Sequence, residues 1–214
     1  MVNSVLRYLF FLCIVRPVVL IVLGLNVRRG DLLPITGPAI VVANHNSHLD
    51  ALTLMTLFGM RRLSIVRPVA AVDYFLSNKW RAWFSTQIIG IIALHRSVSG
   101  ERSDPLAGIS GALAKGNILI LFPEGSRGQP EQLETFKTGI AHIAKRHPDV
   151  SIVPVFLHGL GKSLPRGEGI LVPFFCDVFV GEHIQWTGNR DGFMRLLGDR
   201  ITMLAKEGNF PTWH

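Results

Sequence analysis

The chain is poor in cysteine and in acidic residues. Only two of its 214 residues are cysteines, Cys13 in an apolar N-terminal stretch and Cys176 in a later apolar run. Neither lies near other candidate ligands, so we expect no disulfide framework and no cysteine metal cluster. Fifteen Asp and Glu residues stand against twenty-two Lys and Arg residues, which gives a formal net charge of +7. This balance favours an anionic partner such as phosphate, phospholipid headgroups or nucleic acid.

The sequence also lacks internal repeats and low-complexity segments. A chain of this length can bury one well-formed core, and after Arg29 short apolar runs alternate with amphipathic segments. We expect strands over residues 39–44, 88–94, 117–122 and 151–157. We expect helices over residues 48–58, 105–115, 131–146 and 191–207. This alternation predicts an α/β fold in which helices flank a mixed, largely parallel sheet.

Residues 5–25 form a long apolar run that two arginines interrupt. As one helix the run would reach across a bilayer core, but Arg16 would then lie near its middle at a cost of about 2.5 to 3.5 kcal/mol. Pro17 disfavours helical geometry at Arg16 and suits the first turn of a new helix. We therefore expect two short helices that meet at Arg16–Pro17 and lie in the membrane interface with their arginines at the headgroups.

This reading divides the chain into a membrane-associating arm, residues 1–29, and a catalytic or binding domain, residues 30–214. Two alternatives for the arm are a cleaved signal peptide and a plain spanning helix. No small-residue cleavage site follows the apolar run, and the charge falls at its centre, so the interfacial reading is preferred.

Polar residues follow three of the predicted strands at the points where these strands end. The first strand runs into His45, the second into His95 and Arg96, and the third into the sequence PEGSRG. Ligands of open α/β sheets bind outside the carboxyl ends of the strands. The three strand ends together therefore indicate a common pocket.

The stretch VVANHNSHLD, residues 41–50, combines a buried strand with titratable groups. Ser47 and Asp50 fit a capping-box-like helix start, and a purely structural reading stops there. The same spacing lets the Asp50 carboxylate accept a hydrogen bond from one ring nitrogen of His45 and leaves the other nitrogen basic. That arrangement is a general base with an orienting acid, and the hydroxyl it would activate can come from the substrate.

The stretch FPEGSRG, residues 122–128, offers groups that can hold an anion. Gly125 and Gly128 let the backbone turn sharply and approach a ligand, and Arg127 carries a planar donor fork suited to phosphate. Glu124 can orient that arginine or bind a substrate hydroxyl. A turn of this composition also occurs as a loop without function, so the case depends on its convergence with Arg96 and His45.

These residues carry a family resemblance. The sequence NHNSHLD resembles the H-x4-D motif, and FPEGSRG the F-P-E-G-T-R-S motif, of the glycerophospholipid acyltransferases typified by 1-acylglycerol-3-phosphate acyltransferase. GIIALHR (90–96) resembles the second motif of that family, IVPVFL (152–157) the fourth, and FKTG (136–139) a stretch that follows the third. The resemblance covers residues 35–160. It departs from the family at Ser126, where threonine is common, at Gly128, where serine is common, and at His95, where an aspartate often precedes the arginine.

The resemblance implies acyl transfer from a thioester, on coenzyme A or acyl carrier protein, to a hydroxyl of a lysophospholipid. Carried over by position, His45 is the general base and Asp50 its partner. The residues implied to hold the glycerol phosphate are Arg96, Glu124, Gly125, Ser126 and Arg127. No metal and no cofactor beyond the thioester co-substrate are expected, because the thioester is already activated. The expected acceptor is 1-acylglycerol 3-phosphate, with another lysolipid or glycerol 3-phosphate as alternatives, at the cytoplasmic face of a membrane with anionic lipids.

Three other functions fit parts of the sequence. His45, His48 and Asp50 could be metal ligands of a hydrolase, although no further ligand cluster accompanies them. Gly161, Lys162 and Ser163 match the end of a P-loop, but the first glycine of that motif would fall at Phe156. A noncatalytic adaptor for membranes or nucleic acid would use the positive charge but leave the His45 pattern unexplained, so we expect no nucleic-acid partner.

Overall fold

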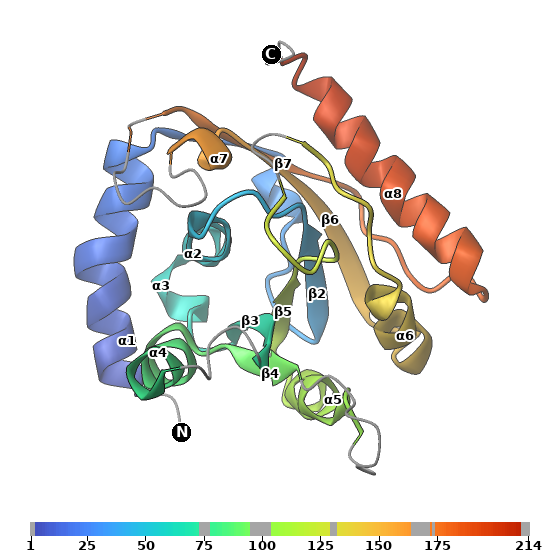
Figure 1. Cartoon of the computed structure of the whole chain (residues 1–214), viewed down its shortest axis with the longest axis horizontal. Coiled ribbons are helices and arrows are strands. Elements are labelled where there is room, and N and C mark those ends of the chain that lie inside the picture. The colour runs from blue at the N-terminus through green and yellow to red at the C-terminus, as the bar shows by residue number, and fades with distance from the viewer. Residues whose placement is uncertain are drawn as a thin grey trace.

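A seven-stranded sheet forms the centre of the computed structural model, which describes residues 3–72, 78–94, 104–128, 132–163, 172 and 174–210 (Figure 1). The strand order is β1-β7-β6-β2-β5-β3-β4. The strands are β1 Leu25–Arg28, β2 Ala39–Ala43, β3 Val66–Ala71, β4 Ile92–Leu94, β5 Ile118–Leu121, β6 Ser151–His158 and β7 Cys176–Val180. Neighbouring strands are parallel except for the antiparallel pair β6 and β7. The predicted mixed, largely parallel sheet is therefore confirmed.

Helices cover both faces of the sheet (Figure 1). On one side lie α1 Ser4–Phe10, η1 Phe11–Val15, η2 Val18–Val22, α2 Leu49–Leu57 and α3 Gly59–Arg62. On the other side lie α5 Ala107–Ala114, α6 Gly139–Arg146 and α8 Arg190–Glu207. The shorter elements are η3 Gly30–Leu32, α4 Lys79–Trp83, η5 Phe84–Ile89 and α7 Leu160–Ser163.

Alternation along the central strand β2 divides the apolar core between the two faces. Val41 and Ala43 pack with the N-terminal helix and α2, whereas Ile40 and Val42 pack with α5, α6 and α8. Successive side chains of a strand point to opposite faces, so a central strand covered on both sides must be apolar at every position. This is why a continuous apolar run, rather than an alternating one, leads into the polar stretch at His45.

Three strands that the sequence analysis did not identify complete the sheet. β3 contains Arg67 and Pro68, β7 contains Asp177, and β1 has a mostly exposed sequence. Polar residues or proline interrupt the apolar run of each one, and tertiary pairing with a neighbouring strand decides their conformation. Asn26 illustrates this, because its side-chain amide donates to Oδ1 of Asp177 across the β1–β7 pair at 2.7 Å.

Two predicted elements are shorter than expected. Residues 88 and 89 end the helix η5, and Gly90 adopts a left-handed conformation with φ of 78°, so only Ile92–Leu94 of the predicted strand 88–94 forms a strand. The predicted helix 131–146 begins only at Gly139 among the described residues. Before it, Lys137 donates its backbone N–H to the carbonyl of Pro123 at 2.8 Å, which ties this segment to the FPEGSRG turn instead of to a helix.

The N-terminal arm is one helical stretch, Ser4–Val22, rather than two short helices. Pro17 is accommodated because the turns on either side of it are of the wide π type, with the amide of Arg16 bonded to the carbonyl of Phe11 and that of Leu23 to Val18. Wide turns relieve the clash that a proline ring makes with the preceding helical turn. The arm then continues into β1, so the division at residue 29 falls after an edge strand of the sheet.

Candidate active site

The site begins at the carboxyl end of β2, where Asn44 fixes the path of the chain. Its side-chain amide donates to the carbonyl of Leu157 at 2.9 Å, and its Oδ1 accepts from the amide of Leu157 at 2.7 Å. A buried side chain thereby continues the hydrogen-bond ladder between β2 and β6 by one position. His45 leaves the sheet from this fixed point.

His45 and Asp50 form a direct pair. Nδ1 of His45 lies 2.8 Å from Oδ2 of Asp50, and the same oxygen accepts the backbone amides of Asn46 at 2.7 Å and Ser47 at 2.8 Å. Because the carboxylate accepts, Nδ1 carries the proton, and Nε2 of a neutral ring is left as the basic nitrogen. The Asp50 side chain is completely buried, whereas that of His45 is 21 % exposed.

Asp50 contributes both to the start of α2 and to the orientation of His45. The hydroxyl of Ser47 accepts the amide of Leu49 at 3.3 Å, and the Asp50 carboxylate accepts the amide of Ser47, so only one half of the predicted capping box forms. The amide of Asp50 donates instead to the backbone carbonyl of Ser47, and His48 is the residue that precedes α2. One carboxylate therefore holds the loop that leads into α2 and orients the histidine. Burial raises the pKa of Asp50, and the hydrogen bonds from His45, Ser47 and Asn46 act in the opposite direction.

The FPEGSRG turn lies directly against this pair. Oε2 of Glu124 accepts the backbone amide of His45 at 3.2 Å, and the amide of Gly128 donates to the carbonyl of His45 at 3.0 Å. The ring of Phe122 stacks on the imidazole with centroids 4.2 Å apart. Two motifs that are about eighty positions apart in the sequence are thus joined through the backbone of His45, which fixes the orientation of its ring.

Glu124 is a buried carboxyl with an unusual protonation. Burial raises its pKa to about 7, against the hydrogen bonds from the backbone of His45 and Glu134, and the nearby charge of Asp50 adds to the rise. Within the described part of the chain, its Oε1 has no hydrogen-bond partner. A carboxyl in this state can donate a hydrogen bond as well as accept one near neutral pH.

Cationic side chains gather at the same turn. Gly125 and Ser126 are exposed, and Arg127 is half-buried. Burial lowers the pKa of His48, and the nearby charge of Arg127 lowers it further. The two side chains are therefore close enough for their charges to interact. This arrangement favours a neutral His48 beside a charged Arg127.

Lys137 is a site residue to which the sequence analysis assigned no role. Gly125 has φ of 73°, and a Cβ atom at that position would lie 2.7 Å from Nζ of Lys137. The ammonium group therefore lies against the turn that is predicted to hold a phosphate, and a side chain at position 125 would displace it. The stretch FKTG signalled this segment, but nothing in the sequence alone placed its lysine beside Gly125.

The structure brings together six of the seven predicted site residues around one loop pair, namely His45, Asp50, Glu124, Gly125, Ser126 and Arg127. Arg96, together with the neighbouring His95, lies outside the described residues. The strand β4, which precedes it, ends at Leu94 on the edge of the sheet next to β3.

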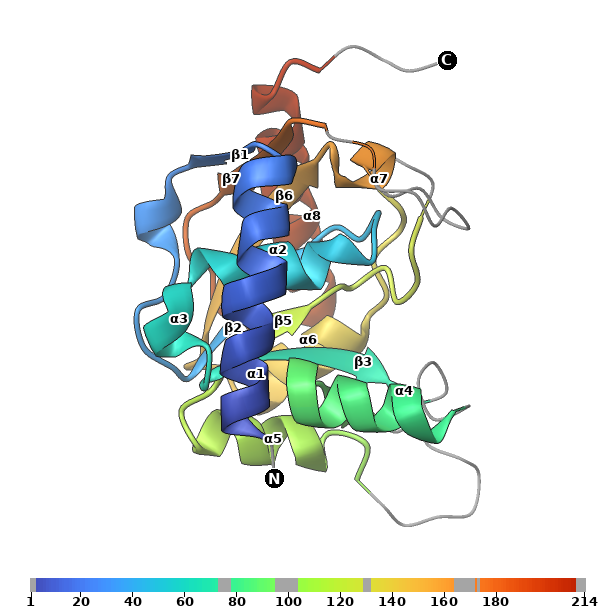
Figure 2. The same cartoon turned by 90° about the vertical axis from the view of Figure 1, so that its left-hand side faces the viewer.

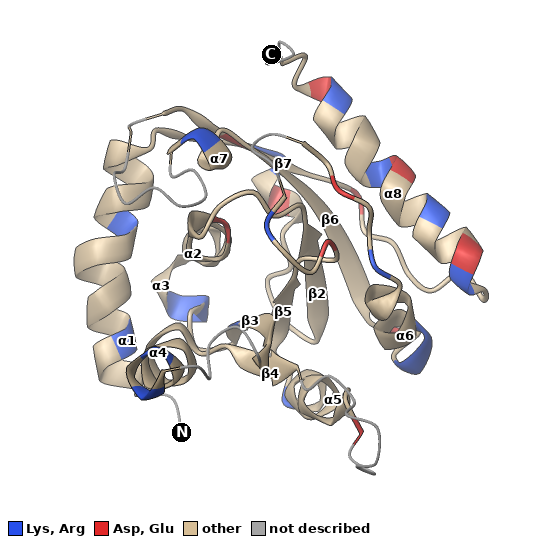
Figure 3. Cartoon of the chain, viewed as in Figure 1, with Lys and Arg blue, Asp and Glu red and all other residues tan. Residues whose placement is uncertain are grey.

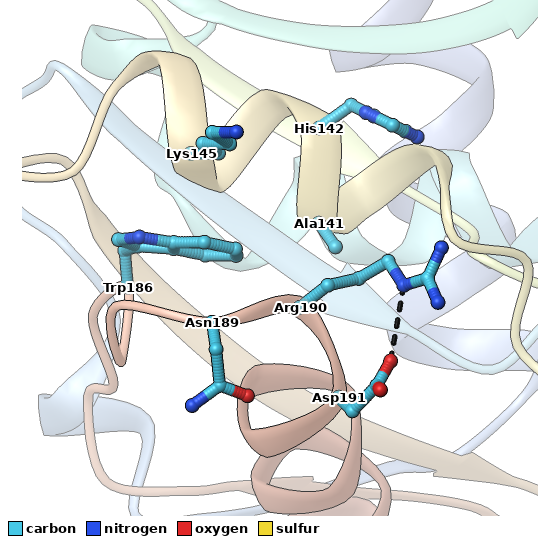
Figure 4. A pocket seen from close by; sticks show the side chains of 7 residues that line it. All are labelled: Ala141, His142, Lys145, Trp186, Asn189, Arg190 and Asp191. Carbon is cyan, nitrogen blue, oxygen red and sulfur yellow. Dashed lines mark hydrogen bonds and ion pairs between the residues drawn. The ribbon is translucent and has the colours of Figure 1, made fainter.

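Two other features bear on the choice of site. Within the described ranges, no three His, Cys, Asp or Glu side chains gather as metal ligands would, and His45 and Asp50 bond to each other. A cavity of about 360 Å³ lies between α6 and the start of α8, where Arg190 donates to Asp191 at 3.0 Å (Figure 4). None of the predicted site residues lines it, and the Asn189 side chain points away from His142 and Lys145, so its polar groups do not converge.

Comparisons with known proteins identify the family of the chain. Residues 24–158 match the model of a protein family described as Acyltransferase. A chloroplastic 1-acyl-sn-glycerol-3-phosphate acyltransferase of Arabidopsis thaliana is 31 % identical over 149 residues, which are 69 % of this chain and 40 % of that protein. The human 1-acyl-sn-glycerol-3-phosphate acyltransferase alpha is 25 % identical over 177 residues, 82 % of this chain and 60 % of that protein. The chain thus spans about two fifths to three fifths of the length of these relatives.

The fold has a counterpart among solved structures. The crystal structure of the 1-acyl-sn-glycerophosphate acyltransferase PlsC from Thermotoga maritima superposes with a TM-score of 0.74. The match covers 99 % of this chain and 81 % of that chain at 19 % sequence identity. Such a likeness at low identity shows a shared fold, which includes the apolar N-terminal helix as well as the sheet.

Proposed function

Because the chain belongs to the acyltransferase family, we propose that it transfers a fatty acyl group from a thioester donor to the hydroxyl of a lysophospholipid. The proposed acceptor is 1-acylglycerol 3-phosphate, the substrate in the names of its plant and human relatives, and the product is then phosphatidic acid. The observation that carries this proposal is the contact of 2.8 Å between Nδ1 of His45 and Oδ2 of Asp50, with the imidazole partly open to solvent.

The proposed reaction needs one proton transfer at His45. Nε2 of the neutral imidazole takes the proton of the acceptor hydroxyl as its oxygen attacks the thioester carbonyl carbon. Asp50 holds the tautomer and stabilises the imidazolium that forms. The tetrahedral intermediate then collapses, the carbon–sulfur bond breaks, and the departing thiolate takes the proton back from His45. No metal ion is part of this scheme, because the thioester is already an activated acyl donor.

The cations near the FPEGSRG turn suit the acceptor headgroup in this proposal. Arg127 offers a fork of N–H donors for a phosphate, and Lys137 adds a second charge close to Gly125. Glu124 is available for a hydroxyl of the glycerol, since its carboxyl can both accept and donate near neutral pH. We infer from the second family motif that Arg96 adds to this anion site.

We also propose that the enzyme works at the surface of a membrane, at its cytoplasmic face. Supporting this, Ser4–Val22 and the residue that follows it bury a stripe of residues four positions apart, namely Arg7, Phe11, Val15, Val19 and Leu23. A helix packed on its own domain along one face is suited to lie in the interface, where its other, apolar face meets lipid. Tags at both termini test this by protease protection, since a surface arm leaves both ends on one side.

The activity is tested by offering purified protein a mixture of acyl-CoA and acyl carrier protein donors with a panel of lysolipids and glycerol 3-phosphate. Mass spectrometry of the products identifies the donor and the acceptor together. We expect phosphatidic acid from wild-type protein and none above background from His45→Ala. If neither protein forms an acylated product across the panel, the proposal is wrong, and a noncatalytic membrane adaptor becomes the better explanation.

A further inference from the structure

The helix α4 and the adjoining η5 present an exposed aromatic face. Trp80 is 80 % exposed, and Trp83 and Phe84, which lie three and four positions on, are 45 % and 36 % exposed. Residues at this spacing share one side of a helix. Two tryptophans left open to water on one helical face are unfavourable in a soluble domain, but tryptophan suits the boundary between water and lipid.

This aromatic face adjoins the N-terminal helix. Phe84 packs edge-on against Phe10 with ring centroids 5.2 Å apart, and the amide of Asn3 donates to the carbonyl of Gln87 at 3.1 Å. Figure 2 shows α4 beside the lower end of α1 on the same side of the molecule. The two helical segments enclose an open groove of about 450 Å³ lined by Leu6, Leu9, Phe10, Cys13, Ile14, Trp83, Phe84 and Ile88.

A buried arginine fixes the two segments relative to the sheet. Arg7 is 3 % exposed, and its Nη2 donates to the carbonyl of Val66 at the start of β3 at 2.7 Å. Arg67, on the same strand, donates to the carbonyl of Gly90, which ends η5. The helix, the strand and η5 are therefore joined by side-chain hydrogen bonds, and the groove between them is a fixed feature of the fold.

The charged residues of the N-terminal helix, α3, α4 and η5 are all positive. Residues 4–22, 59–62 and 79–89 contain no Asp or Glu, and Arg61, Lys79 and Arg81 are exposed. Figure 3 shows blue but no red on α1, α3 and α4. Such a surface is complementary to anionic lipid headgroups. A second copy of the chain would set like charges against each other, so the pattern argues against a protein–protein contact between copies.

We propose that α4 is a second membrane-contacting element, which forms one platform with the N-terminal helix on a bilayer that contains anionic phospholipid. Trp80 and Trp83 enter the interface, Lys79 and Arg81 meet headgroup phosphates, and an acyl chain of a bilayer lipid lies in the groove. This inference rests on the membrane association proposed for the N-terminal helix and adds to it. With two contacts instead of one, the domain is held in a single orientation on the membrane.

The first test measures binding to vesicles of phosphatidylglycerol and phosphatidylcholine by co-sedimentation. The double substitution Trp80→Ala/Trp83→Ala should weaken binding by roughly 10- to 100-fold, because the apolar burial of both side chains is lost. Met203→Ala is the control, since Met203 is 62 % exposed on α8, on the far side of the sheet. Wild-type binding by the double variant, or an equal loss in the control, overturns the inference.

The separate contributions are resolved by Ile21→Ser, which alters the exposed face of the N-terminal helix. If Ile21→Ser loses vesicle binding while Trp80→Ala/Trp83→Ala keeps it, the N-terminal arm stands and the role of α4 is wrong. Turnover of a short-chain, fully soluble acceptor should be unchanged in the tryptophan variant. That assay tests the acyltransferase activity by itself, so its failure is distinguishable from failure of the membrane platform.

The second test places the tryptophans in the bilayer directly. Two full-length variants keep either Trp80 or Trp186 and carry Phe at the other tryptophans, and both are mixed with vesicles of brominated phospholipid. Fluorescence of Trp80 should be quenched and that of Trp186, beside α6 and α8, should not. Equal quenching of both overturns the inference, as does a wild-type dimer that Trp80→Ala/Trp83→Ala converts to a monomer.

Discussion

The polar edge around His45 and the apolar side formed by the N-terminal helix and α4 differ in what they bury. The first buries a charged group, and the second leaves large apolar side chains exposed. At the first, a fully buried carboxylate is held by three donors and holds a histidine in return. At the second, large apolar side chains such as Ile21 and Trp80 remain about four fifths exposed. Buried charge and exposed apolar surface are both unfavourable for the isolated protein. Each therefore points to a ligand, a reacting hydroxyl at the first and lipid at the second.

The largest effect should follow from removing the base at the polar edge. His45→Ala should lower turnover by roughly 10² to 10⁴, because general base catalysis by a positioned side chain contributes about that factor. The melting temperature should fall somewhat, because the imidazole is one of the three donors to the buried Asp50 carboxylate. Steady-state kinetics on the folded variant, with the exposed His142→Ala as control, provide the measurement. Wild-type turnover in folded His45→Ala would contradict the mechanism.

Asp50→Asn sharpens the same comparison, because Asp50 serves the fold as well as the base. An amide removes the negative charge from the oxygen that accepts all three hydrogen bonds and that orients His45. We expect turnover to fall by about 10² or more and the melting temperature to fall as well. A loss of activity with unchanged thermal unfolding would show that the contribution of Asp50 to the stability of this loop is minor.

On the apolar side, two neighbouring positions of one helix should behave differently. Val19 is 1 % exposed and Ile21 is 79 % exposed. Val19→Ser should lower the free energy of unfolding by about 2 to 3 kcal/mol, whereas Ile21→Ser should change it by less than about 0.5 kcal/mol. Urea unfolding in detergent-free buffer measures both. Equal destabilisation at the two positions would mean that the exposed face also packs on protein.

A smaller effect is expected at the anion site. Arg127→Lys keeps the charge but loses the guanidinium fork, so the KM for the lysophospholipid should rise about tenfold with less change for the acyl donor. Arg96→Ala should act in the same direction. Arg146→Lys, at a surface ion pair with Asp104, is the matched control and should leave both values unchanged. Unchanged acceptor kinetics in both site variants would remove these arginines from the headgroup site.

The smallest expected effect concerns the pH dependence of stability. The pKa of Glu124 is about 7 in the folded protein and 4.5 for an ordinary glutamate, so the folded state holds this proton more tightly. The stability that this provides is complete below pH 4.5 and is lost as the pH rises through 7. Melting temperatures from pH 4 to pH 8 should therefore show a decline that Glu124→Gln lacks. Parallel profiles of the two proteins would contradict the raised pKa.

The contact between His45 and Asp50 could be predicted from the sequence because its geometry is local. His45, Ser47 and Asp50 lie within six residues, and hydrogen bonds from this same stretch to the Asp50 carboxylate fix their relative positions. The family and the largely parallel sheet could also be predicted from the sequence, since buried strands and the motifs that follow them are continuous in it. The roles of the site residues remain predictions that the proposed variants test.

Only the tertiary structure decided what depends on residues far apart in the chain. Lys137 reaches Gly125 because its backbone amide bonds to Pro123, and β1, β3 and β7 are strands because neighbouring strands pair with them. The arm is one helix despite Pro17, because wide turns and a buried stripe along the domain outweigh the local preference of proline. Local hydrogen bonds and apolar periodicity depend on residues that are close in the sequence. Packing, in contrast, selects among backbone conformations that are nearly equal in free energy for a short stretch alone.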